Sequence, residues 1–385
     1  MTHLPILLKL ILVLLYSLSP TLKPLLAPVG SYEASYENLG IPLSEYYRDG
    51  IRARTAWDVE IYNEKLFVAS GDYDANSGPV HIYEYDLNEG LWRDSATVLD
   101  EQIERFIILD DGLLAPGCDP RQDWTYGNIY RYEDDTWNTY RTIPGGIHQF
   151  DAVKFDGKLF VGLGVAPGEY PVAMSEDGGQ SFQSVSMYKD GIPLDTSVAE
   201  NISVQIRIYD FFILNDQLYA FYFRYFENNL TLELYRYDNG AFYYHSDLPG
   251  KFSYKRINYE VFNAKAEYQG TMYFTTGNLY TSKDMKSANR ISFGSNANVP
   301  DLRVIGDQLY ACVVSPTEDG QYRSSIWVKS QSNNQFKEVF YFIFPCPAQS
   351  FTYHDGVFYF GMGDGILSDH NPNNGTILKV THAVK

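Results

Sequence analysis

Alternating apolar and polar residues recur along this chain in short runs separated by tight-turn residues. Within residues 148–182, FDAVKF alternates, Asp156-Gly157 supplies a two-residue turn, and KLFVGLG follows as the partner strand. The segment continues with YPVAMSE, a DGGQ turn and a fourth short run that begins near Phe182. This pattern predicts a four-stranded, up-and-down antiparallel sheet.

The second strand of this unit has counterparts throughout the chain. Its first large apolar residue recurs at intervals of 37 to 59 residues, at Leu66, Leu113, Leu159, Leu218, Met272, Leu309 and Phe358. Third strands recur as IYEYD, IYRYE and LYRYD, and an aromatic residue follows them in the fourth strands. A four-stranded sheet repeated at this period predicts an all-β chain folded as a β-propeller. Seven blades is the predicted count, and the short fifth unit leaves six open.

Three segments are predicted. Residues 1–27 are leucine-rich, but prolines and a lysine shorten the apolar run to the length of a signal peptide, with a retained N-terminal anchor as the alternative. Residues 28–55 form a tyrosine-rich leader, and residues 56–385 form the propeller. The last unit stops after its third strand, so a leader strand from residues 31–39 or 45–54 is expected to close the ring. We therefore expect an exported protein, either secreted or at the cell surface.

The net charge of the chain narrows the choice of partners. The net charge is −18 and Lys and Arg do not cluster, which argues against nucleic acid and against docking on anionic lipid. Membrane contact is expected only through an N-terminal anchor.

The three cysteines are Cys118, Cys312 and Cys346. A Cys312–Cys346 disulfide is one alternative, and free thiols are the other.

Acidic residues recur at one position of the repeat. We call the first large apolar residue of each second strand its marker. The position eight residues before the marker holds aspartate in four units, arginine in the second unit and serine in the last: Asp58, Asp151, Asp210, Asp301, Arg105 and Ser350. Equivalent positions of a propeller lie at one level around its axis, so these side chains are expected to ring the mouth of the central channel. They form either a polar ligand pocket or hydrogen bonds to backbone N–H groups of neighbouring blades.

Long loops after the second strands open on the same face of the predicted propeller. They carry aromatic and acidic residues that we expect at the rim: Trp124, Tyr126, Glu169, Tyr170, Tyr225 and Tyr322. His148 lies three residues before Asp151. Pockets with a few convergent polar groups belong at such mouths. The candidate ligand-binding residues are therefore these aromatic side chains together with Arg105 and His148.

The carboxylates predicted at this rim also allow an enzymatic interpretation. Glycoside hydrolysis uses two carboxyl groups at a defined separation. The pool of candidates for catalysis is Asp58, Asp151, Asp210, Asp301 and Glu169. No acid or nucleophile is assigned, because the sequence does not give the separations.

Ser175-Glu-Asp177-Gly-Gly179-Gln-Ser-Phe182 resembles the Asp-box, S-x-D-x-G-x-x-F/W, of the sialidase-like (BNR) β-propellers. The resemblance covers eight residues and the blade repeat. It implies a structural turn between third and fourth strands, away from any active site. Sialidases also carry three arginines for the substrate carboxylate, and only Arg105 occupies a matching position here. The resemblance therefore implies the propeller fold rather than sialidase activity.

The first long loop contains a candidate metal site. Asp72-Tyr-Asp74-Ala-Asn76 resembles the D-x-D-x-N calcium loops, which in integrin-type propellers lie between strands of a blade. Alternate side-chain oxygens can wrap a hard cation. The loop departs from the pattern because its glycine comes one residue late. Calcium at Asp72, Asp74 and Asn76 is one expectation, and a solvated turn is the other.

The sequence favours a non-enzymatic function. We expect an exported β-propeller that binds a glycan or a protein ligand on its loop-rich face. A carbohydrate-active enzyme with carboxylates at the channel mouth is the first alternative. A cell-surface interaction scaffold with a calcium-stiffened loop is the second. The fold alone does not choose among them.

Overall fold

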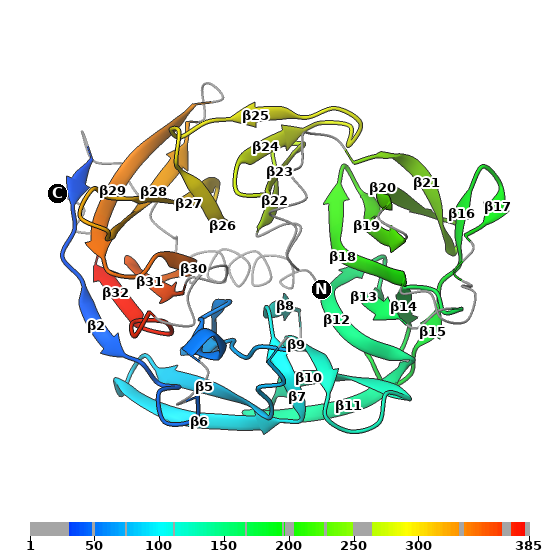
Figure 1. Ribbon diagram of the computed structural model, residues 1–385, viewed down its shortest axis with the longest axis horizontal. Helices are drawn as coiled ribbons and strands as arrows, with labels where there is room; N and C mark the ends of the chain where they lie inside the picture. The colour runs from blue at the N-terminus through cyan, green and yellow to red at the C-terminus, as the bar shows by residue number, and fades with distance from the viewer. Residues whose placement is uncertain are drawn as a thin grey trace, which may run out of the picture.

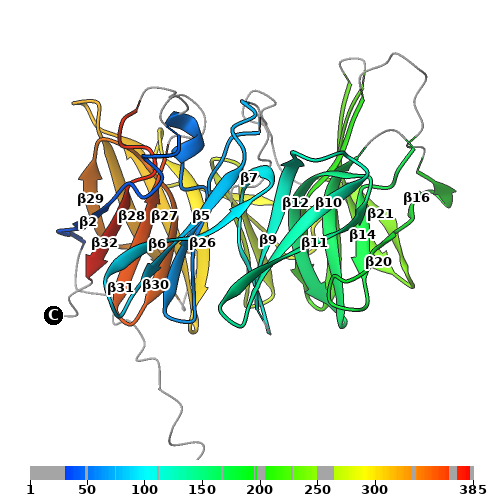
Figure 2. The ribbon, with the colours of Figure 1, turned by 90° about the horizontal axis from the view of Figure 1, so that it is seen from below.

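The computed structural model describes residues 31–47, 51–73, 75–110, 112–165, 168–194, 196, 204–226, 229–248, 264–330, 335–363 and 371–381. Apart from a 3-10 helix, η1 (Ile51–Arg54), the regular elements of these ranges are β-strands. Sheets succeed one another around a common centre (Figure 1), and their strands run between two faces of the molecule (Figure 2). The predicted all-β class is confirmed, and the arrangement is consistent with a β-propeller-like fold.

The strands belong to five hydrogen-bonded sheets, none of which closes on itself. The first contains β3 (Val59–Tyr62), β4 (Lys65–Val68), β5 (Val80–Asp86) and β6 (Leu91–Val98). A sheet of fifteen strands follows, and its first part contains β7 (Asp100–Ile103), β8 (Ile107–Leu109), β9 (Gly112–Pro120), β10 (Tyr126–Glu133) and β11 (Thr136–Pro144). Its second part contains β12 (Gly146–Phe155), β13 (Lys158–Val165), β14 (Val172–Ser175) and β15 (Gln183–Ser184).

The third part of the fifteen-stranded sheet contains β16 (Met187–Lys189), β17 (Ile192–Pro193), β18 (Val204–Leu214), β19 (Gln217–Phe226), β20 (Asn229–Asp238) and β21 (Ala241–Asp247). The next sheet is β22 (Lys265–Tyr268), β23 (Thr271–Thr275), β24 (Leu279–Ser282) and β25 (Asn289–Ile291). A five-stranded sheet contains β1 (Tyr32–Glu33), β26 (Asn298–Ile305), β27 (Gln308–Pro316), β28 (Tyr322–Lys329) and β29 (Phe336–Phe344). The last contains β2 (Glu37–Gly40), β30 (Ala348–His354), β31 (Val357–Met362) and β32 (Ile377–Thr381).

The repeat read from the sequence corresponds to real hairpins. Each of the seven second-strand markers lies on the second strand of an antiparallel hairpin, and all seven are at most 5% exposed. The turn at Asp156-Gly157 has positive φ at both residues, 49° and 73°, as a type I′ hairpin requires. After this turn β13 is buried at six consecutive positions, from Leu159 to Gly164, so its apolar side chains lie in the core.

The leader contributes two short strands, β1 and β2, to two different sheets. β2 pairs antiparallel with β32, with Asn38 opposite Leu378, and it overlaps the first of the two leader segments predicted to do so. β1 pairs in parallel with β29. The second predicted segment, residues 45–54, instead contains turn residues and η1 within its described part.

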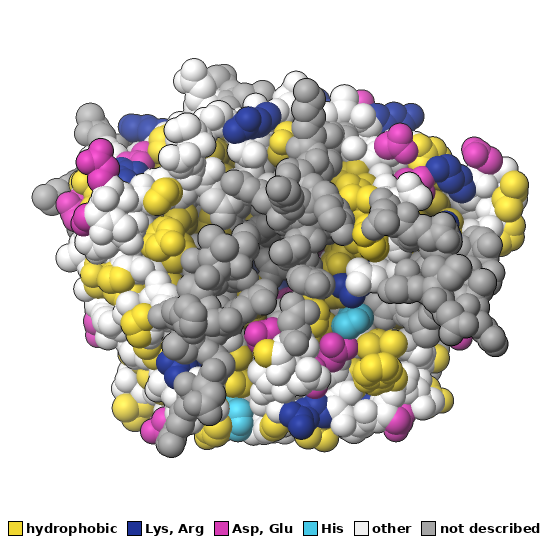
Figure 3. All heavy atoms as spheres, in the orientation of Figure 1, with side chains coloured by type: hydrophobic (Ala, Val, Ile, Leu, Met, Phe, Trp, Pro, Cys, Tyr) yellow, Lys and Arg dark blue, Asp and Glu magenta, His cyan; other side chains and the backbone are white. Residues whose placement is uncertain are grey.

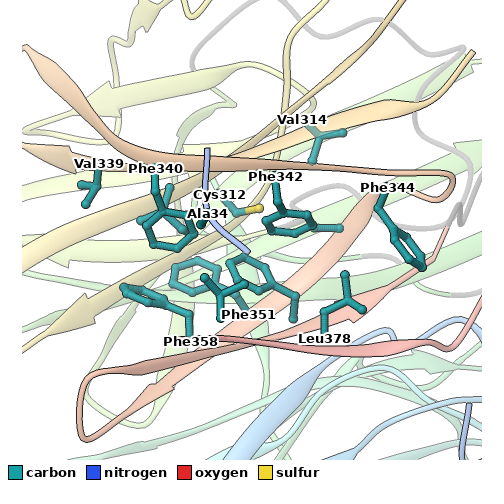
Figure 4. Close-up of a cluster of buried hydrophobic side chains, with 14 of the residues drawn as sticks. Ala34, Cys312, Val314, Val339, Phe340, Phe342, Phe344, Phe351, Phe358 and Leu378 are labelled. Atoms are coloured by element: carbon teal, nitrogen blue, oxygen red, sulfur yellow. The ribbon is translucent and has the colours of Figure 1, made fainter. Parts of the chain in front are cut away.

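The hydrophobic core lies between neighbouring sheets. Figure 4 shows one such layer, in which Phe340 and Phe342 of β29 face Phe358 of β31. The rings of Phe340 and Phe358 meet edge to face at 5.2 Å, and those of Phe342 and Phe360 at 4.8 Å. Aromatic side chains suit this position because each buries a large apolar area.

The cysteines are buried free thiols. Cys312 lies in the aromatic layer of Figure 4, and the Sγ of Cys346 donates to Asn374 Oδ1 at 3.2 Å. The Cys312–Cys346 bridge, one of the two alternatives considered, is therefore not formed in this structure.

The predicted signal peptide or anchor, residues 1–27, lies outside the described residues. Among the residues that are described, no helix has the length and apolar character needed to cross a membrane.

Candidate functional site

A cavity of about 450 Å³ lies among the innermost strands of the successive sheets. Residues of β3, β8, β12, β22, β26 and β30 line it, and these strands surround the centre of the molecule in Figure 1. We call the position eight residues before each second-strand marker the ring position. The cavity lining includes five of the six ring-position residues named above, all except Asp210: Asp58, Arg105, Asp151, Asp301 and Ser350. The sequence repeat therefore brings distant residues together at one cavity.

The repeated aspartates join neighbouring inner strands. Asp58 Oδ2 accepts the backbone N–H of Phe106 at 2.8 Å, and Asp151 Oδ2 accepts that of Phe211 at 2.8 Å. Asp301 Oδ2 accepts the N–H of Phe351 at 2.9 Å. Each donor directly follows the ring position of the next unit. These three contacts fit the structural interpretation left open by the sequence, and each of them engages the Oδ2 atom of an aspartate.

A first ion cluster contains Arg105, Asp151, Asp210 and Lys265. The Nη1 of Arg105 lies 2.9 Å from Asp210 Oδ1 and 3.4 Å from Asp151 Oδ1. The Nζ of Lys265 lies 2.9 Å from Asp210 Oδ1 and also contacts Asp151. Burial raises the pKa of Asp210, although both cations oppose that shift. Two cations match two carboxylates, so this cluster is formally neutral.

A second ion cluster contains Asp58, Glu60, Asp301 and Arg303. The Arg303 guanidinium lies 2.6 Å from Asp58 Oδ1 and 3.3 Å from Asp301 Oδ2, and its Nη1 contacts Glu60. Burial raises the pKa of Asp301 to about 6, against the favourable field of Arg303 and with a contribution from the nearby Asp58 charge. Burial also raises the pKa of Glu60. Three carboxylates share one cation, so this cluster carries excess negative charge.

Sequence reasoning missed Glu60, Lys265 and Arg303. Counting eight residues back from each marker selects one position per unit, whereas these three lie one or two residues further along the strand. A signal was present, because side chains two residues apart on a strand point to the same face. Glu60 follows Asp58, and Arg303 follows Asp301, at that spacing.

Three of the predicted rim residues lie around one backbone contact, between Thr125 and Gly145. Trp124 and Tyr126 are 62% and 42% exposed. The carbonyl of Thr125, between them, accepts the N–H of Gly145 at 2.9 Å, and the Glu169 side chain lies against Gly145. We call Trp124, Tyr126 and Glu169 the loop-edge patch. It does not line the cavity.

The other predicted rim residues are separated. Tyr170, Tyr225 and Tyr322 are partly buried and pack against three different hydrophobic clusters. His148 stacks on Phe150, and its Nδ1 lies 2.9 Å from Asp119 Oδ1 and 3.4 Å from Cys118 Sγ. None of these four residues lines the cavity.

The Asp-box sequence forms a turn between β14 and β15 that is closed by its own side chains. Ser175 Oγ accepts the N–H of Gly179 at 2.8 Å, and Asp177 Oδ1 accepts the N–H of Ser181 at 2.9 Å. Ser282 and Asp284 make the same kind of turn between β24 and β25, with Ser282 Oγ accepting the N–H of Met285 at 2.8 Å. The sequence analysis missed this second turn, because SKDMKS keeps the serine and aspartate but lacks the glycine.

The predicted calcium loop is partly described. Asp72 is buried, its Oδ1 accepts the N–H of Ala75 at 3.3 Å, and its own N–H donates to Ser77 Oγ at 2.7 Å. Asn76 adopts a positive φ of 52°, and Asp74 lies outside the described residues. Within the described ranges, no group of three or more His, Cys, Asp or Glu side chains is arranged to hold a metal ion. Calcium binding stays a prediction.

Comparisons with known proteins give no family. No protein-family model matches the chain, and no curated protein matches its sequence. A crystal structure of the computationally designed Ika8 protein is similar with a TM-score of 0.46 and 9% identity, over 86% of this chain and 96% of that one. A chain of a mitotic checkpoint complex is similar with a TM-score of 0.49 and 11% identity, over 84% and 89% of the two chains. A puromycin hydrolase mutant gives a TM-score of 0.45 and 12% identity, over 86% and 52%. Likenesses this distant assign no function.

Proposed function

We propose that this protein is a seven-bladed β-propeller, in which the fifteen-stranded sheet counts as three blades bridged at their inner strands and β2 completes the last blade. Seven hydrophobic clusters among the described residues support this count, since each joins one set of strands to the next. The cluster that contains Val59, Leu66 and Tyr359 joins the last sheet to the first. The two Asp-box-like turns support a relation to the sialidase-like propellers.

Its proposed role is to bind a glycan or a protein ligand without catalysis, as an exported protein that is secreted or held at the cell surface. The loop-edge patch is the proposed contact surface, and the observation that carries the proposal is the exposure of Trp124 and Tyr126 beside Glu169. Such aromatic rings offer an apolar face for a sugar ring, and a carboxylate accepts hydrogen bonds from sugar hydroxyls. On the face drawn in Figure 3, the described hydrophobic, acidic and basic side chains are interspersed, which favours contact by shape and stacking over contact by charge on that face.

A carbohydrate-active enzyme is the second candidate, and Asp301 favours it. A buried carboxyl group with a pKa of about 6 is suited to general acid catalysis. Both Asp301 oxygens are engaged, however: Oδ1 accepts the N–H of Leu302 at 2.7 Å and Oδ2 accepts that of Phe351. The two arginines of the cavity are also paired with carboxylates, Arg105 with Asp210 and Arg303 with Asp58. These contacts support a binding role over a hydrolytic one and argue against recognition of a carboxylated sugar.

A glycan array tests the binding role. Trp124→Ala is expected to weaken any glycan signal at least roughly tenfold, because truncating an aromatic anchor costs about 2 kcal/mol or more. Tyr243→Ala is the matched control, since Tyr243, like Tyr126, is an aromatic side chain that is 42% exposed, but it lies on β21. Equal signals from the wild type and both variants would remove the loop-edge patch from the proposal.

A further inference from the structure

We propose that the central cavity is a second binding site, independent of the loop-edge patch, for a primary alkylammonium group carried on an apolar chain. The cavity is lined by charged side chains and, toward the hairpin turns, by apolar side chains as well, and its volume of about 450 Å³ is within the range of small-molecule sites. The two parts of its wall match the two parts of such a ligand.

The charge of the lining selects a cation. Six carboxylates line the cavity, namely Asp58, Glu60, Glu104, Asp151, Glu267 and Asp301, against the three cations Arg105, Lys265 and Arg303. The excess is concentrated in the second ion cluster, where Arg303 alone faces three carboxylates. Low-dielectric walls strengthen the field of such a charge, so the cavity attracts cations and repels anions.

The carboxylates keep room for another donor. The Asp58 carboxylate accepts two hydrogen bonds, from Phe106 N–H and Arg303 Nη2. A carboxylate can accept about four, so further acceptor positions remain on Asp58. An ammonium group has three donors and can use them without displacing Arg303.

Apolar side chains occupy the end of the cavity nearest the hairpin turns. Ile107, Ile108, Ala266 and Val304 line it, and Ile108 and Val304 are 53% and 46% exposed. Each lies on the inner strand beyond the ring position, toward the turn that leads to the second strand. An alkyl chain would cover these residues while its ammonium group reaches Asp58 and Glu60. Glu267, which is exposed at the same end, adds to the attraction.

The described residues favour an organic cation over a metal ion. The cavity carboxylates are not among any group of three or more His, Cys, Asp or Glu side chains arranged to hold a metal in the described ranges. Arg303 also occupies the centre of the second cluster, where a metal ion would meet a like charge.

Isothermal titration with three matched six-carbon probes tests the site. n-Hexylamine is expected to bind saturably, and hexanol and hexanoate at least roughly tenfold more weakly. N-acetyl-lysine methylamide, as a fourth probe, distinguishes a lysine side chain of a partner from a free amine. Hexylamine affinity should rise between pH 5 and pH 7, because a bound cation favours the ionised form of Asp301, whose pKa is about 6. Equal binding of hexanoate would overturn the proposal.

A variant at the mouth of the cavity provides a second test of the site. Val304→Lys places an ammonium group of the protein itself at the cavity mouth, at a position exposed enough to accept it. Hexylamine affinity is expected to fall at least tenfold, whereas Tyr243→Lys, on the outer strand β21, should leave it unchanged. Unchanged binding by Val304→Lys, with unaltered melting, would place the amine outside the cavity and reject the site.

Discussion

Replacing Arg303 by methionine is expected to destabilise the fold by about 3–5 kcal/mol at pH 7.5, because removing one partner of a buried ion pair leaves the other charges uncompensated. Arg303 is 23% exposed and contacts Asp58, Glu60 and Asp301 at once. Urea unfolding of the wild type and the variant measures the loss. Methionine retains most of the apolar stem, so the change isolates the charge.

Acid should rescue this variant. The pKa of Asp301 is about 6 in the folded wild type against an ordinary 3.8, so the folded state holds that proton more tightly than the unfolded chain. The contribution of Asp301 to the free energy of unfolding therefore rises as the pH falls from 7 through 6 toward 4. The Arg303 charge opposes the burial shift at both Asp301 and Glu60, so without it the pKa values of these two carboxyl groups rise further. The stability difference between variant and wild type should then shrink at pH 5.

Arg93→Met is the matched control. Arg93 is 46% exposed and pairs with Asp86 and Glu89 on the surface, so its loss should cost less than about 1 kcal/mol at either pH. Equal losses for Arg303→Met and Arg93→Met would show that the second ion cluster does not stabilise the inner strands.

Phe360→Ala is expected to cost about 3–5 kcal/mol, the range for deleting a buried aromatic side chain. Phe360 is fully buried between Phe342 and Phe351, and the layer in Figure 4 joins two successive sheets. Thermal and urea unfolding check the value. Leu91→Ala, at a side chain that is 57% exposed, should stay within about 0.5 kcal/mol. A loss as small at Phe360 would mean that this layer adds little to the joining of the sheets.

The repeat was predictable because it depends on local rules. Alternation locates the strands, paired left-handed residues such as Asp156-Gly157 locate the turns, and a buried residue such as Leu66 recurs once per unit. The hairpin β16–β17 was not predicted. Met187 of β16 pairs in parallel with Phe242 of β21, far along the chain, and no local pattern encodes that contact.

The candidate site was predictable only in its position. The recurrence of Asp58, Asp151 and Asp301 led to the central cavity, because equivalent positions converge when repeated sheets are arranged around a common centre. The chemistry of the cavity was not predictable, since it depends on which cation lies between which carboxylates. Lys265 reaches Asp151 and Asp210 across two units, a contact that only the three-dimensional arrangement defines.

The pairing of β2 with β32 sets the order in which this protein can be completed. Asn38 is made long before its partner Leu378. The last sheet therefore keeps an open edge until β32 has been made, and a chain truncated before Ile377 lacks the strand that receives the leader. Bringing together two strands so far apart in the sequence has a high entropic cost and slows folding. Once they are paired, each of the two strands holds the other in place.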